Sequence, residues 1–150
     1  MLYFEDFPAG DIHEWGNRKI GEDEIIAFAR RYDPQPMHTD PVAARDTMLG
    51  GLAASGWHTA ALTMRMVCDE FMLDSASLGS PGVPELDWER PVRPGDTLRV
   101  RRTVLEARRS QSRPDMGIVN FLFEVFNQDG TRVMRMTAAI MLRTRPEKAA

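Results

Sequence analysis

The chain has 150 residues, of which 43% are hydrophobic and 27% are charged, and this is the size and balance of one globular domain with its own core. Its formal net charge of -3 argues against a protein that binds nucleic acid through overall positive charge. The single cysteine, Cys68, excludes an intrachain disulfide and favours a reducing compartment.

Signals for export or membrane insertion are not evident. The first ten residues carry Glu5 and Asp6 and lack the basic start of a signal peptide. No segment contains the roughly 18 consecutive apolar residues that a membrane-spanning helix requires. We therefore expect a single cytoplasmic domain, residues 1–150, that has neither nucleic acid nor a membrane as a partner.

The first half of the chain predicts one strand and two helices. Weak alternation of apolar and polar residues over 12–19 indicates the strand. Residues 22–31 have the spacing of an amphipathic helix with an acidic first turn, and Pro34 ends it. Residues 55–72 predict a longer helix that is apolar on nearly every side, with Ser55 as its N-cap. A helix of this kind is usually enclosed by other structure.

The second half predicts a set of long strands. Apolar and polar residues alternate along four segments, namely 83–90, 97–107, 117–127 and 131–143. The sequence Asn127-Gln128-Asp129-Gly130 is typical of a hairpin turn between the last two. One apolar helix and one large antiparallel sheet together favour an α+β fold in which the sheet wraps the helix.

A proline-rich segment between the two helices carries two side chains that handle protons. Three prolines from Pro34 to Pro41 restrict the backbone of this loop and would hold Asp33 and His38 in fixed positions. A carboxylate and an imidazole in a rigid loop suit general acid–base catalysis. An ordinary loop, in which Asp33 caps a turn and His38 is solvated, fits the composition better when these residues are considered alone.

A glycine-rich segment precedes the long helix. Gly50 and Gly51 permit a tight bend, and Gly56 begins the helix, whose N-terminus is electropositive and presents free backbone N–H groups. Such an end binds an oxyanion or a thioester carbonyl. Small residues that let the helix approach the sheet explain the same pattern equally well. Taken together, however, the two segments supply a proton-transfer pair and an electrophilic pocket.

The residues of these two segments resemble the MaoC-like dehydratases, a family that includes the (R)-specific enoyl-CoA hydratases. The resemblance covers nearly the whole chain. It is carried by Tyr32-Asp33-Pro34-Gln35-Pro36-Met37-His38, by Ala43-Ala44, by residues 50–56, by Tyr3-Phe4-Glu5-Asp6-Phe7 and by residues 90–98. It implies a hot-dog fold, in which an antiparallel sheet wraps one long central helix, and a homodimer or a higher oligomer of dimers with sites near the subunit interface.

The resemblance also implies a function for individual residues. Asp33 and His38 fall on the catalytic pair of the family, and Gly56 falls on the residue whose backbone N–H binds the thioester carbonyl. Ser55 and Trp57 flank Gly56 and are included in the expected substrate-binding set. The implied reaction is reversible addition of water to a trans-2-enoyl-CoA, a hydro-lyase step of acyl-CoA and fatty acid metabolism.

Two other functions stay open at this point. One is an acyl-CoA thioesterase, which has the same fold and would also bind the thioester carbonyl at the helix N-terminus. The other is a non-catalytic acyl-CoA-binding module, because Ser55 replaces a histidine and Met64 replaces a serine found in many members of the family. The chemistry needs no cofactor, and the three histidines have no ligand-like spacing with Cys68, so we expect no metal site. Several arginines fit either the phosphates of coenzyme A or a solvated surface, and the solvated surface is favoured: Arg99, Arg101, Arg102, Arg108, Arg109 and Arg113.

Overall fold

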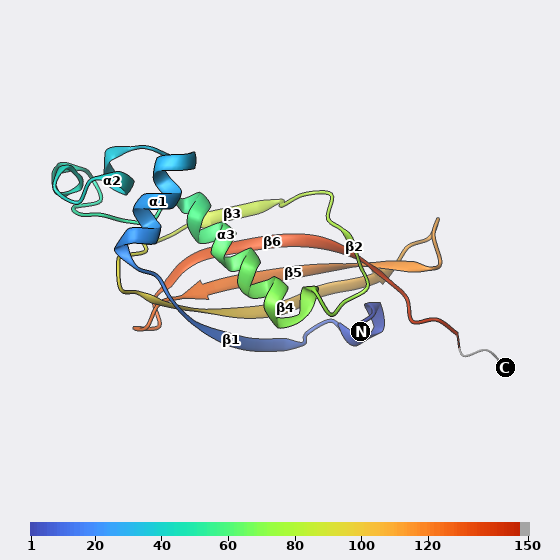
Figure 1. Ribbon diagram of the computed structural model, residues 1–150. Helices are drawn as coiled ribbons and strands as arrows, with labels where there is room; N and C mark the ends of the chain where they lie inside the picture. Colours follow the sequence, from blue (N-terminus) through green and yellow to red (C-terminus); the bar gives the residue numbers. More distant parts are fainter. Residues whose placement is uncertain (148–150) are drawn as a thin grey trace.

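In the computed structural model, which describes residues 1–147, a curved antiparallel sheet carries a long helix across one face (Figure 1). The strands are β1 (Ile12–Lys19), β2 (Ser77–Gly79), β3 (Glu85–Trp88), β4 (Thr97–Arg109), β5 (Met116–Phe126) and β6 (Arg132–Arg143). They are ordered β1-β4-β5-β6, and both β2 and β3 pair with the far side of β6. The α+β arrangement expected from the sequence is confirmed.

The helices lie over one face and one end of this sheet. They are α1 (Glu22–Tyr32), α2 (Pro36–Thr39) and α3 (Gly56–Val67), with 3-10 turns at η1 (Phe4–Asp6) and η2 (Ala43–Asp46) and a π-helical turn at η3 (Cys68–Met72). The helix α3 crosses the sheet, while α1 and α2 gather at the end where α3 begins (Figure 1). None of the helices in residues 1–147 combines the length and apolarity needed to cross a membrane.

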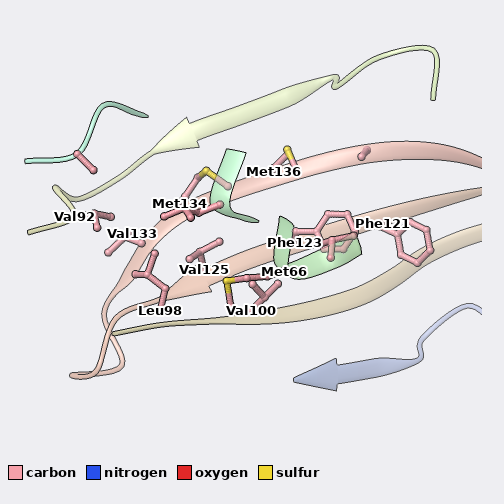
Figure 2. Close-up of a cluster of buried hydrophobic side chains, with 14 of the residues drawn as sticks. Met66, Val92, Leu98, Val100, Phe121, Phe123, Val125, Val133, Met134 and Met136 are labelled. Atoms are coloured by element: carbon pink, nitrogen blue, oxygen red, sulfur yellow. The ribbon is translucent and has the colours of Figure 1, made fainter. Parts of the chain in front are cut away.

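The core fills the space between α3 and the inner face of the sheet. Alternate residues of the three central strands point inward, so that side chains such as Val100, Phe123 and Met134 pack beneath Met66 of α3 (Figure 2). This alternation is the pattern from which the strands were predicted. Because these side chains pack between the sheet and α3, they fix the distance between the two. The segment that leads into α3 is positioned with it.

The structure departs from the predicted elements in four places. The predicted strand 83–90 is shortened to β3, and the short strand β2 carries no sequence pattern that indicates it. The proline-rich loop contains the one-turn helix α2, because Pro36 occupies its first position, where the missing N–H costs nothing. The long helix is apolar on nearly every side and was expected to be enclosed by other structure, but its face with Trp57 and Met64 is exposed.

Candidate active site

Asp33 lies at the first position after α1, and its backbone N–H donates to the carbonyl of Ala29 in the last turn. The side chain turns toward the start of α3. The Ser55 hydroxyl donates to Asp33 Oδ2 at 2.6 Å, and Gln35 Nε2 donates to Asp33 Oδ1 at 2.7 Å. One neutral donor on each oxygen fixes the carboxylate and leaves further lone pairs free.

The pKa of Asp33 lies below the ordinary value for an aspartate. Burial works in the opposite direction, because it disfavours the charged form. The hydrogen bonds from Ser55 and Gln35, together with the charge of His38 when it is protonated, outweigh that effect. Asp33 is therefore ionised at neutral pH and available to accept a proton or a hydrogen bond.

His38 lies in the short helix α2 and is buried, and each of its two ring nitrogens faces a different neighbour. Its Nδ1 lies 2.7 Å from the carbonyl oxygen of Ala53. Because a carbonyl oxygen only accepts, Nδ1 carries a proton, so the neutral form of the ring has its lone pair at Nε2. That Nε2 faces Asp33 Oδ2 at 3.5 Å. Two acceptors at this separation can both accept hydrogen bonds from one water molecule that lies beside them, about 2.8 Å from each.

The N-terminus of α3 is open toward this pair. Ser55 occupies the N-cap position, as predicted, but its hydroxyl makes no bond to the helix and is given to Asp33 instead. The first N–H groups of a helix have no partner within the helix. Those of Gly56 and Trp57 find no acceptor elsewhere in residues 1–147. The helix therefore begins with two free donors and its positive dipole end.

A cavity of about 250 Å³ lies beside the histidine and the helix start. Its walls come from α2, the segment before α3, α3 itself, the end of β3 with the chain that follows it, and the start of β6. The lining residues are His38, Leu49, Ala53, Ala54, Gly56, Thr59, Trp88, Glu89, Arg90, Pro91, Val92 and Val133. The Trp88 ring lies directly on Gly56, where a Cβ would be 2.4 Å from the ring atoms. Only glycine fits at the first position of α3 while Trp88 keeps this place.

The structure brings most of the predicted site residues together. Ser55 is hydrogen-bonded to Asp33, His38 Nε2 lies 3.5 Å from the same Asp33 oxygen, and Gly56 joins His38 in the wall of the cavity. The side chain of Trp57 points away from the cavity and is 61% exposed, so that only its backbone N–H lies at the helix start. Met64 is also on the exposed face of α3.

Two contributions to the site carry no signal in the sequence. The backbone carbonyl of Ala53, which orients His38, depends on the path of the chain and not on a side chain. Trp88 belongs to an edge strand and reaches the site only because β3 runs beside the helix start. The hydrogen bond from Gln35 follows from its position two residues after Asp33, within the motif that the sequence singled out.

Other polar residues that the sequence raised lie away from the cavity. His58 is buried and stacks on Phe28 with ring centroids 4.4 Å apart, and burial lowers its pKa. Five of the six arginines considered above are ion-paired, namely Arg99, Arg101, Arg102, Arg109 and Arg113. Four of these five side chains are partly or largely exposed, which supports the solvated surface that was favoured for them. For Arg102 that interpretation is wrong, because its side chain is buried against Phe7 and Phe71.

Comparison with known proteins adds a family and a set of related structures. The family model described as "MaoC like domain" matches residues 8–121. A crystal structure from Rhodospirillum rubrum named as a MaoC-like dehydratase has 44% sequence identity and a TM-score of 0.91, and covers 97% of this chain and 99% of that one. The (R)-hydratase PhaJ1 from Pseudomonas aeruginosa has 27% identity and a TM-score of 0.73, with 99% of this chain and 92% of that one covered.

Among curated proteins, the Bacillus subtilis protein YdeM, which is named as uncharacterized, is 25% identical over 142 residues, or 95% of this chain and 99% of its own length. The structural similarities confirm the hot-dog fold, with its antiparallel sheet wrapped around a central helix. These alignments cover 95% to 99% of this chain, so the similarity is not confined to the motif at Asp33.

Proposed function

The chain belongs to the MaoC-like domain family, a family of hydratases and dehydratases, and we propose that it catalyses reversible addition of water to the double bond of a trans-2-enoyl-CoA. One observation carries the proposal. Asp33 Oδ2 and His38 Nε2 face each other at 3.5 Å beside the uncapped start of α3. This geometry combines an acid–base pair with donors for a carbonyl oxygen.

The helix start is suited to the thioester carbonyl. The N–H of Gly56, with that of Trp57, would donate to the carbonyl oxygen and stabilise the enolate-like charge that develops there during addition. Ser55 contributes indirectly, because its hydroxyl holds Asp33 and leaves these N–H groups unblocked. The Trp88 ring against Gly56 restricts the direction from which the carbonyl approaches.

The acid–base pair is suited to one water molecule. Both Asp33 and neutral His38 offer acceptors, so a water between them would donate a hydrogen bond to each. As its oxygen attacks C3, the water gives one proton to the pair, and the pair delivers a proton to C2. The net change is addition of H and OH across the double bond, and dehydration is the same path in reverse.

The size of the cavity favours a short acyl group. A volume of about 250 Å³ lies just below the usual range for ligand pockets, ~300–1,000 Å³. Much of that space would be taken by the thioester and the reacting carbons. We therefore expect crotonyl-CoA to react faster than long-chain enoyl-CoA.

We propose a homodimer as the working assembly. On the exposed side of α3 and the edge strand β3, three large apolar side chains are uncovered: Trp57 is 61% exposed, and Met64 and Trp88 are each 45% exposed. The rings of Trp57 and Trp88 meet edge to face at 4.9 Å and form a continuous apolar surface. Sedimentation should give a mass of twice 17.0 kDa or a multiple of it.

The test is an assay of the purified protein on a panel of enoyl-CoA substrates of different length, branching and charge. Loss of the conjugated enoyl absorbance reports hydration, and a free-thiol reagent in a parallel sample reports thioester hydrolysis. The variants D33N and H38Q keep the shape of each side chain while removing its acid–base function. We expect absorbance loss without thiol release in the wild type, and neither signal in the two variants.

Other outcomes would assign another function. Thiol release by the wild type would identify a thioesterase. Binding of acyl-CoA with no change in either signal would identify a non-catalytic binding module. Absorbance loss that persists in both D33N and H38Q would place the catalytic groups elsewhere in the protein.

A further inference from the structure

Arg93, in the turn between β3 and β4, makes an unusual set of contacts. Its Nη1 donates to the carbonyl oxygens of Gly51 at 2.9 Å and Leu52 at 3.2 Å, and its Nη2 donates to the carbonyl of Leu49. The side chain is half-buried, and within residues 1–147 no carboxylate lies within ion-pair distance of its guanidinium. The guanidinium of Arg93 is therefore bound by the backbone carbonyl groups of one short segment, Leu49–Leu52.

That segment leads directly into the backbone that orients His38. Ala53 follows Leu52, and its carbonyl oxygen accepts the hydrogen bond from His38 Nδ1. The N–H of Ala53 donates to the carbonyl of Met37 at 3.1 Å, and the N–H of Ala54 donates to the carbonyl of Val92 at 2.9 Å. The histidine, its acceptor and the residue before Arg93 are thus joined by consecutive hydrogen bonds.

Arg93 is itself fixed at its backbone. Its N–H donates to Asp96 Oδ2 at 2.8 Å, and Gln128 Nε2 donates to Asp96 Oδ1 at 2.9 Å. Asp96 is buried and belongs to the Pro-Gly-Asp turn that opens β4, and Gln128 lies in the hairpin between β5 and β6. The guanidinium therefore extends from the rigid end of the sheet to the loop beside the site.

We propose that Arg93 is a positioning residue for His38: it holds the Leu49–Ala53 backbone so that the Ala53 carbonyl keeps the proton on Nδ1 and directs the lone pair of Nε2 to Asp33. A loop with two glycines, Gly50 and Gly51, has no stiffness of its own. The planar fork of an arginine reaches several carbonyls at once, which a lysine ammonium on a flexible stem does not. The expected effect of Arg93 on the hydration rate rests on the proposed function. Its expected effect on the protonation of the His38 ring does not.

The first readout is the protonation pattern of the His38 ring, measured without any substrate. The chain has three histidines, so nitrogen-detected NMR of labelled protein resolves each ring, and H38Q identifies the signals of His38. We expect the Nδ1–H form in the wild type, and a mixture of the two neutral forms in R93M and R93K. The matched control is R135M. It removes an arginine of β6 that is bonded to Glu85 and Asp87 of β3, and it is expected to leave the His38 signals unchanged.

The second readout is the rate of hydration of crotonyl-CoA. We expect kcat to fall on the order of 10²-fold in R93M with little change in KM, because a misplaced catalytic group slows chemistry more than binding. R93K keeps the charge and most of the stem, so a similar fall there separates loss of the planar fork from loss of charge. If R93M does not fold, R93K alone carries both measurements.

The two readouts separate the possible failures. If R93M or R93K changes the protonation pattern of His38 and the wild type has no hydratase activity, the positioning role is supported and the proposed function is overturned. Wild-type His38 signals in R93K, in a folded protein, would overturn the positioning role whatever the activity is. An equal change in R135M would also overturn it, because the effect would then follow from any lost arginine.

Discussion

Asp33, just after α1, and Glu124, near the end of β5, are both largely buried carboxylates whose pKa lies below the ordinary value. Burial raises the pKa of each, and hydrogen bonds outweigh it, but the donors differ. Asp33 accepts from the hydroxyl of Ser55 and the amide of Gln35. Glu124 accepts from two guanidinium groups, with Oε1 bound by Arg101 and Oε2 by Arg132.

The difference separates a carboxylate that stabilises the fold from one that is suited to chemistry. Glu124 is neutralised on both oxygens and ties three strands together, because Arg101 lies on β4 and Arg132 on β6. Asp33 is held in place by neutral donors, so its charge is not cancelled and it faces His38 at 3.5 Å. Neutral donors fix a carboxylate without consuming the charge that a proton or a water needs.

The largest expected effect is on the rate after the substitution D33N. Asparagine keeps the shape and one acceptor of Asp33 but removes the charge, and kcat/KM for an enoyl-CoA is expected to fall about 10³-fold, the typical contribution of a general acid or base. The free energy of unfolding should change by less than about 1 kcal/mol. Denaturant unfolding and the absorbance assay measure the two effects. A stable variant with full activity would remove Asp33 from the mechanism.

The reverse pattern is expected for E124Q. The amide cannot neutralise two guanidinium groups, and the free energy of unfolding should fall by about 2 kcal/mol. This figure is below that for a fully enclosed pair because Arg101 and Arg132 are 37% and 36% exposed and can turn toward water. Tm should fall by roughly 6 °C, while activity at a temperature well below Tm is retained. Loss of activity without loss of stability would contradict the division between the two carboxylates.

The smallest expected effect is a shift in pH dependence after S55A. The Ser55 hydroxyl stabilises the charged form of Asp33, so its removal raises the pKa of Asp33. The acid limb of kcat/KM should then move toward higher pH, with a smaller change at neutral pH. Stability that depends on the ionised Asp33 is present above its ordinary pKa and is lost as pH falls through the folded value. Because S55A brings the folded pKa closer to the ordinary one, this loss should be smaller in S55A and should be complete at a higher pH.

A matched serine provides the control for that shift. Ser75 is also partly buried, but its hydroxyl donates to the carbonyl of Met72 at the far end of the central helix. S75A is therefore expected to leave the acid limb in place. If both variants moved the limb equally, the effect would come from general loosening of the fold and not from the bond to Asp33.

Much of the fold was predictable because its signals are local. The alternation along 97–107 and 117–127 specified β4 and β5 nearly to their ends, since a strand with one buried face requires that period. The acidic first turn and the following proline specified α1 in the same way. Errors occurred where no local period exists, as in the three residues of β2, or where a proline permits a helix as well as a loop, as in α2.

By itself, the sequence determined an α+β fold, a central helix, and Asp33 with His38 as a candidate pair, because period, turn chemistry and a short motif are all properties of neighbouring residues. The tertiary structure decided the rest. It turned the Ser55 hydroxyl from its own helix to Asp33, set the Ala53 carbonyl against His38, laid Trp88 on Gly56 and left one face of α3 uncovered. Each of these depends on where side chains distant along the chain point once the sheet has formed, and no local pattern specifies that direction.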